Sequence, residues 1–192
     1  MEKIARKTVN NLIQVKIKEQ QRIENKENRD RYVATQCLYH ILAKKNKSVK
    51  IVNTPTLCPV DLKCTSYTYT NKSIAFNVEI KERNKDNKTL ESYPYAELRV
   101  DKLDRMYKET ARGTKLYYMV LLNREKMYLF DLDNLDYDKL HVYNWYIKDT
   151  EMSDNSSYSV YPTYQIPYSA ATVTLDISNF FDDYEKIKED NK

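Results

Sequence analysis

The segment from Ser73 to Glu82 constrains the fold most strongly, because apolar and polar side chains alternate along it. A repeat of this kind is typical of a β-strand. One side carries the apolar residues Ile74, Phe76, Val78 and Ile80, and the other carries Ala75, Asn77, Glu79 and Lys81. Because the apolar side has to be buried, Glu79 and Lys81 project together from the opposite side of a rigid strand.

The patterns around this strand predict an α/β (α+β) fold, with a central mixed β-sheet flanked by helices. Helical spacing predicts helices over about 30–45 and 94–111, the first capped by Asn28 or Asp30. Gly113 follows the second helix, at a place where a helix C-cap favours positive φ. Further strands are expected over 49–52, 60–69, 115–122 and 127–132.

The chain is expected to form one domain with an appendage at its start. Residues 1–27 are highly charged and have a thin apolar face, so they are interpreted as an N-terminal helical extension. Residues 28–192 form the domain, with a core over 28–132 and a C-terminal elaboration over 133–192. In the elaboration we expect a strand or helix over 140–147, a late strand over 171–175 and a short charged helix over 180–188.

Composition excludes several classes of function. The single glycine rules out the Gly-rich phosphate loops of GxGxxG and Walker A sites. The three cysteines form no CxxC pair, which argues against a disulfide framework and a structural zinc site. No segment has the apolar character of a signal peptide or membrane span, so we expect a cytoplasmic protein without a membrane partner.

Charge and codon usage add weaker indications. The net charge of +4 permits binding to nucleic acid without requiring it. The chain is rich in Lys, Asn, Ile and Tyr, whose codons are AT-rich, and this composition fits a phage or a low-GC bacterium. The 18 tyrosines therefore do not by themselves imply stacking on bases.

A second carboxylate is expected next to Glu79. A turn at Asn71-Lys72 would make a hairpin and bring Asp61 within about two residues of Glu79 across the ladder. Two adjacent carboxylates repel each other unless a cation lies between them. Mg²⁺ suits such a pair, and Lys81 beside it would stabilise charge on an attacked phosphate. The arrangement predicts hydrolysis of a phosphodiester by a metal-activated water.

These residues resemble the pattern of the PD-(D/E)XK nuclease superfamily, whose members are restriction-endonuclease-like. The match consists of Pro59-Val60-Asp61, then Glu79-Ile80-Lys81 after a hairpin, with Val60 separating Pro from Asp as a departure. The predicted helix–three strands–helix–strand order over 28–132 resembles the αβββαβ core of that family. The resemblance implies a Mg²⁺-dependent nuclease, with Mn²⁺ as a substitute ion, DNA as the substrate, and a homodimer.

The resemblance also implies supporting residues. Family members often add an acid from the first helix, and Asp30 matches that position as a third metal ligand, although it also fits a helix N-cap. The second helix of the family often carries polar residues that reach the site, which makes Glu97 and Lys102 candidates for substrate binding. Lys63 shares a strand face with Asp61 and is a candidate for contact with phosphate.

Three alternatives remain open at this level. Glu79 and Lys81 can form a solvated pair on an open sheet face, without any chemistry. The chain can be a catalytically inactive module on the same fold that binds nucleic acid or serves assembly. It can also be a toxin or inhibitor that binds a protein through anchors in its Tyr-rich C-terminal third, with candidates Tyr158, Tyr161, Tyr164 and Tyr168.

Overall fold

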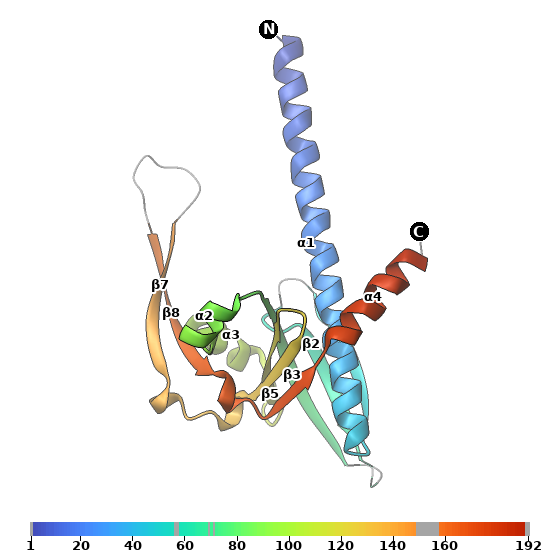
Figure 1. Ribbon diagram of the computed structural model, residues 1–192, viewed down its shortest axis with the longest axis vertical. Helices are drawn as coiled ribbons and strands as arrows, with labels where there is room; N and C mark the ends of the chain where they lie inside the picture. Colours follow the sequence, from blue (N-terminus) through green and yellow to red (C-terminus); the bar gives the residue numbers. More distant parts are fainter. Residues whose placement is uncertain (1, 56–57, 69, 71, 149–157, 191–192) are drawn as a thin grey trace.

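The computed structural model describes residues 2–55, 58–68, 70, 72–148 and 158–190. Within these ranges the chain forms two β-sheets and four α-helices (Figure 1). The α-helices are α1 (Glu2–Lys44), α2 (Asn87–Ser92), α3 (Val100–Glu109) and α4 (Ser178–Asp190). Short 3-10 helices are η1 (Leu132–Asn134), η2 (Tyr137–Lys139) and η3 (Tyr168–Ala170).

The larger sheet has six strands in the order β1-β2-β3-β5-β6-β9. These strands are β1 (Ser48–Asn53), β2 (Leu62–Tyr67), β3 (Ser73–Arg83), β5 (Lys115–Leu122), β6 (Lys126–Asp131) and β9 (Val173–Asp176). Neighbours are antiparallel except β3 and β5, which are parallel. The smaller sheet has the order β4-β8-β7, with strands β4 (Tyr95–Arg99), β8 (Tyr158–Pro167) and β7 (His141–Lys148).

Both faces of the larger sheet are covered. On one face, buried residues of α1 and α4, such as Val33, Leu38 and Phe181, pack against Phe76 and Val78 of β3. On the other face, a second cluster joins the sheet to α3, β4 and β8; it includes Ala96, Leu98, Met106, Leu116, Phe130 and Ile166. The predicted α+β class, a mixed sheet flanked by helices, is confirmed.

The first helix differs from the sequence prediction. A start at Asn28 or Asp30 is wrong, because α1 runs continuously from Glu2 and incorporates residues 2–27. This segment contains neither glycine nor proline, so nothing in the backbone interrupts the helix. Its first part extends beyond the sheets in Figure 1. No helix in the described ranges combines the length and the apolar character needed to cross a bilayer.

The helix predicted over 94–111 is wrong at its beginning, where the chain forms β4 instead. Ala96 and Leu98 are buried and their neighbours are half-buried, so the repeat is two and not three to four. Pairing of β4 with β8 stabilises this strand, and the partner lies far along the chain. The helix α3 starts only at Val100.

The turns of the larger sheet follow the sequence more closely. Residues Asn123 and Arg124 both adopt positive φ in the tight turn between β5 and β6. The hairpin of β2 and β3 is confirmed, although Asn71 of its predicted turn lies outside the described residues. Gly113 does have a positive φ of 83°, but it lies in the turn that precedes β5, beyond the end of α3.

A buried ion cluster attaches α1 to the centre of the sheet. The side chain of Glu82 is 3 % exposed and accepts contacts from Arg29 at 2.8 Å, Lys26 at 3.0 Å and Arg124 at 3.5 Å. Arg29 also bonds Asp30 at 3.0 Å. Glu82 of β3 thus pairs with two cations of α1, Lys26 and Arg29, at the point where the helix crosses the sheet.

Replacing Glu82 with Ala should lower the free energy of unfolding by about 3 kcal/mol, because three cations would lose their shared carboxylate. Urea unfolding followed by circular dichroism measures this change. The matched control is Asp136→Ala, which removes an exposed pair with Lys139 and should change stability by less than about 0.5 kcal/mol. Equal effects of the two substitutions would contradict the role given to Glu82.

Candidate active site

Asp61 is held in place by backbone groups of β3. It lies immediately before β2, where its N–H donates to the carbonyl of Val78 at 2.9 Å. Its Oδ2 accepts a hydrogen bond from the backbone N–H of Ile80 at 2.7 Å, and Arg31 of α1 lies 3.7 Å from Oδ1. Because Leu62 pairs with Val78, Asp61 falls beside Glu79, as the predicted hairpin requires.

Glu79 and Asp61 form an adjacent carboxyl pair. Glu79 is 8 % exposed, and its side chain lies within hydrogen-bonding reach of Asp61. Burial, and next the charge of Asp61, raise the pKa of Glu79 to about 8. Lys102 of α3 lies 2.8 Å from Oε1 of Glu79 and opposes this rise. The pair therefore carries a proton at neutral pH, which a bound cation would displace.

Lys81 lies two residues beyond Glu79 on β3 and lines the same cleft. Lys81 is an exposed residue, but partial desolvation of its ammonium group, and next the charge of Arg83, lower its pKa, while Glu79 acts in the opposite direction. The sequence prediction that Asp61, Glu79 and Lys81 share one side of the sheet agrees with this geometry.

Glu79 and Lys81 line a cleft with a volume of about 350 Å³, and Asp61 is not among its lining residues. It lies between β3, α3 and the smaller sheet. The side chains that line it include two acids, Glu79 and Glu97, and five cations: Lys81, Arg83, Arg99, Lys102 and Arg105. This excess of positive charge suits an anionic ligand with several charged oxygens, such as a phosphate backbone.

The donors present fit a magnesium ion. Burial, and next the charge of Asp61, raise the pKa of Glu79, and a divalent cation between the two carboxylates would offset both effects. No cluster of three or more His, Cys, Asp or Glu side chains occurs in the described part of the chain. Mg²⁺ does not require one, because it is commonly bound by one or two carboxylates, with water and phosphate oxygens completing the shell.

Asp30, predicted as a third ligand, is not brought to this pair. It lies in the ion cluster of Arg29 and Glu82. The side chain of Glu82 points to the side of β3 opposite Glu79. Burial, and next the charge of Glu82, raise the pKa of Asp30 to about 6. The prediction fails because α1 packs on the apolar side of β3, where Asp30 meets Arg29 and Glu82; the residue of α1 that approaches Asp61 is Arg31.

The predicted substrate-binding residues have different positions. Lys102 is in the cleft and pairs with Glu79. Lys63 lies on β2 opposite Asn77, and it lines a separate hollow with Lys50 and Thr65, outside the cleft. Its sheet face was correctly predicted, but its distance along the strand excludes it from the cleft.

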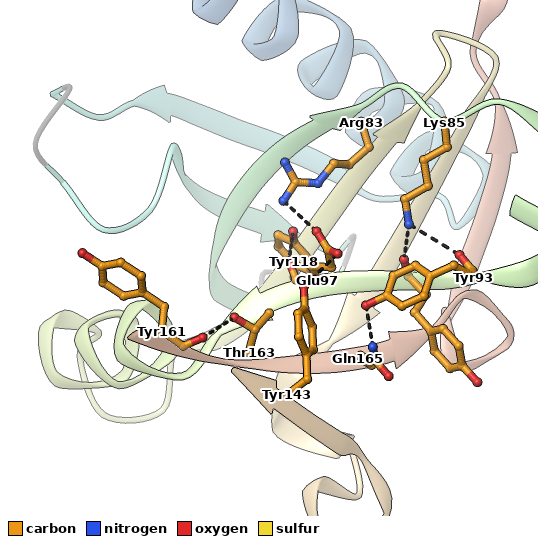
Figure 2. A network of polar contacts seen from close by, with 10 residues as sticks. Arg83, Lys85, Tyr93, Glu97, Tyr118, Tyr143, Tyr161, Thr163 and Gln165 are labelled. Carbon is orange, nitrogen blue, oxygen red and sulfur yellow. Dashed lines mark hydrogen bonds and ion pairs between the residues drawn. The ribbon is translucent and has the colours of Figure 1, made fainter. Parts of the chain in front are cut away.

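Glu97 lies in the cleft, on the strand β4 and not on a helix. One carboxylate oxygen accepts the hydroxyl of Tyr143 at 2.9 Å, and the other lies 3.5 Å from Arg83 (Figure 2). The hydroxyl of Tyr118 donates to the backbone carbonyl of Glu97 at 2.8 Å. Glu97 therefore connects the smaller sheet to β3 and is already neutralised, which makes it a positioning residue for Arg83.

Several residues of the cleft escaped sequence reasoning. Arg83 could have been found, because it continues the side of β3 that carries Glu79 and Lys81. Arg99 and Trp145 belong to the smaller sheet, and no local pattern indicates that β4, β8 and β7 pair. Arg105 lies on α3. Because the start of this helix was predicted too early, the face of the helix that carries Arg105 could not be assigned from the sequence.

The tyrosines proposed as protein-binding anchors are largely engaged within the fold. Tyr164 and Tyr168 pack against the second core cluster, and the ring of Tyr161 lies 3.7 Å from the Arg99 guanidinium carbon. The side chain of Tyr158 lies outside the described residues.

Comparison of the chain with known protein families, with curated proteins and with solved structures found no match.

The carboxyl pair predicts a dependence of stability on pH in a solution with a chelator. The folded state holds a proton on Glu79 up to about pH 8, whereas the unfolded chain releases it near 4.5. The stabilising contribution of this proton is therefore complete at low pH and is lost as pH rises through about 8. Urea unfolding at a series of pH values measures the loss.

The matched control is Glu79→Gln, which keeps the hydrogen-bonding shape and removes the titration. The free energy of unfolding of the wild type minus that of the variant should fall steadily from pH 5 to about pH 8. A difference that is constant over this range would contradict the assigned state of the pair.

Proposed function

We propose that this protein is a Mg²⁺-dependent nuclease of the PD-(D/E)XK type that hydrolyses phosphodiester bonds in DNA. The observation that carries the proposal is that Asp61 lies beside Glu79 across the β2–β3 ladder, while Glu79 and Lys81 line a cleft dominated by cations. Adjacent carboxylates serve cation binding, and the surrounding cations serve a polyanion. This combination is difficult to explain as a solvated surface pair, because Glu79 is buried.

The order of elements supports the same proposal. The helix α1, the strands β1, β2 and β3, the helix α3 and the strand β5 follow the order that the resemblance implies, with α2 and β4 inserted before α3. The antiparallel pairs β1–β2 and β2–β3, together with parallel β3–β5, place Glu79 and Lys81 on an interior strand.

Each residue has a specific part in the proposed reaction. Asp61 presents a carboxylate fixed by the Ile80 N–H, and Glu79 loses its proton to complete the anionic pair. Mg²⁺, when bound, supplies a Lewis acid and lowers the pKa of a water molecule. The Lys81 ammonium offsets charge that develops on the attacked phosphate, and Arg83, held by Glu97, lies next to it in the cleft.

One observation favours a second candidate, a catalytically inactive protein that binds nucleic acid. The Lys102 ammonium lies 2.8 Å from Glu79, where its positive charge partly takes the place of a metal ion. If this ion pair is permanent, the cleft binds phosphate but no Mg²⁺. Cation binding and cleavage separate the two candidates.

Replacing Lys81 with Ala should reduce Mg²⁺-dependent cleavage by roughly 100-fold or more, because the charge that stabilises the transition state is lost. The assay is a panel of linear, circular, single-stranded and branched DNA together with RNA, each with Mg²⁺ and with Mn²⁺. The matched control is Lys63→Ala, a lysine on the same sheet face outside the cleft, which should cut at the wild-type rate. A folded Lys81→Ala protein that cuts as fast as the wild type would refute the proposal.

Binding of the cation should release about one proton, since Glu79 has to ionise. Calorimetric titration with Mg²⁺ or Mn²⁺ in buffers of different ionisation enthalpy measures that proton. The affinity should rise roughly tenfold per pH unit up to about pH 8.

Two variants test the origin of this dependence. Asp61→Asn should weaken cation binding, because it removes one carboxylate of the pair, and Lys102→Ala should strengthen it by removing a competing charge. Absence of binding to the wild type and to Lys102→Ala alike would favour the inactive candidate.

A further inference from the structure

The only tryptophan of the chain, Trp145, lines the cleft that contains Glu79 and Lys81. It lies on β7 of the smaller sheet and is 37 % exposed. Partly exposed tryptophans are enriched at binding interfaces, because the ring offers a large apolar surface with a polar N–H. Its position beside Arg99 and Arg105 gives the cleft a flat apolar surface next to positive charge.

The strands of the smaller sheet hold this part of the cleft rigid. Trp145 pairs with Tyr161 of β8, and Thr163 pairs with Arg99 of β4. The Arg99 guanidinium lies over the Tyr161 ring at 3.7 Å and binds Asp101 through two bonds of 2.8 and 2.5 Å. Arg99 is thereby fixed in orientation, and its strand position places it on the same sheet face as Trp145.

A second set of contacts attaches this sheet to the carboxyl pair's strand. Tyr143, two residues before Trp145, donates to Glu97, and Glu97 contacts Arg83 of β3 (Figure 2). Because residues two apart on a strand share a face, Trp145 lies on the same side of the smaller sheet as Tyr143, the side that meets β3. The distance from the ring to the reacting centre is thus set by the fold and not by a loose loop.

A ring in this position can stack only on a base whose face is free. In a continuous duplex the faces of each base are covered by its neighbours, whereas unpaired bases stack readily on aromatic side chains. The cations beside the ring match the phosphates that flank such a base. A double-stranded substrate without an unpaired base would leave Trp145 unused.

We propose that the cleft takes single-stranded nucleic acid, with one unpaired base stacked on Trp145 and the adjoining backbone bound by Arg99 and Arg105. This inference rests on the proposed nuclease function, since it assumes that the cleft binds nucleic acid. It goes further by assigning a substrate class, namely single strands or unpaired segments, such as frayed ends and flaps.

The uniqueness of Trp145 allows a direct measurement on the intact chain, because its fluorescence reports this one position. A short oligothymidylate, added in the presence of a chelator that prevents cleavage, should quench the tryptophan fluorescence and saturate. A blunt duplex of the same length should bind more weakly and cause little quenching. Equal or tighter binding of the duplex would overturn the proposal.

Variants measured by anisotropy of a labelled oligothymidylate provide an independent test. Trp145→Ala should weaken binding roughly tenfold, in the range of base–aromatic stacking, whereas Trp145→Phe should retain most of the affinity. The matched control is Tyr146→Ala, which removes an aromatic that is 61 % exposed on the opposite face of β7 and should bind like the wild type. Equal affinity of Trp145→Ala and wild type would contradict the assignment.

The outcomes separate this inference from the proposed function. A chain that prefers oligothymidylate through Trp145 but cuts nothing with Mg²⁺ contradicts the nuclease proposal and leaves the binding preference intact. A chain that cuts continuous duplex and binds oligothymidylate no better overturns the preference alone.

Discussion

Two glutamates on the central strand β3 are almost completely buried, and they point to opposite faces of the sheet. Glu82 is 8 % exposed and so is Glu79. A buried carboxylate is costly unless cations or a proton neutralise it. Glu82 is neutralised by Arg29 and Lys26 of α1, with Arg124 nearby, so this helix is anchored by charge as well as by apolar packing.

The charge of Glu79 is less completely neutralised. It has one cation, Lys102, and a neighbouring acid, Asp61, and the balance leaves its pKa at about 8. The contrast between the two glutamates supports the proposed roles, because strongly shifted pKa values cluster at functional sites. The same strand thus combines a fully paired glutamate with an incompletely paired one only three residues away.

The features that could be predicted from the sequence are those that follow from the alternation of apolar and polar residues along one strand. The shared face of Glu79 and Lys81, and the hairpin that brings Asp61 beside them, follow from local pattern. Asp30 could not be placed, because its environment depends on which sheet face α1 covers. The stretch over 94–99 was wrongly predicted as helix, because local pattern does not show its partner strand. That partner, β8, lies far along the chain, and its pairing with β4 stabilises the strand.

The two sides of the cleft come from different sheets, and this separation has an evolutionary consequence. Asp61, Glu79 and Lys81 depend on β2 and β3, whereas Trp145 and Arg99 depend on β7 and β4. Under the proposed function, substitutions of Trp145 or Arg99 would alter recognition while leaving the backbone that positions the carboxyl pair in place, whereas Glu97 couples the two sheets through Arg83. Such a division would let the proposed reaction centre be inherited unchanged while descendants of the chain diverge in what they recognise.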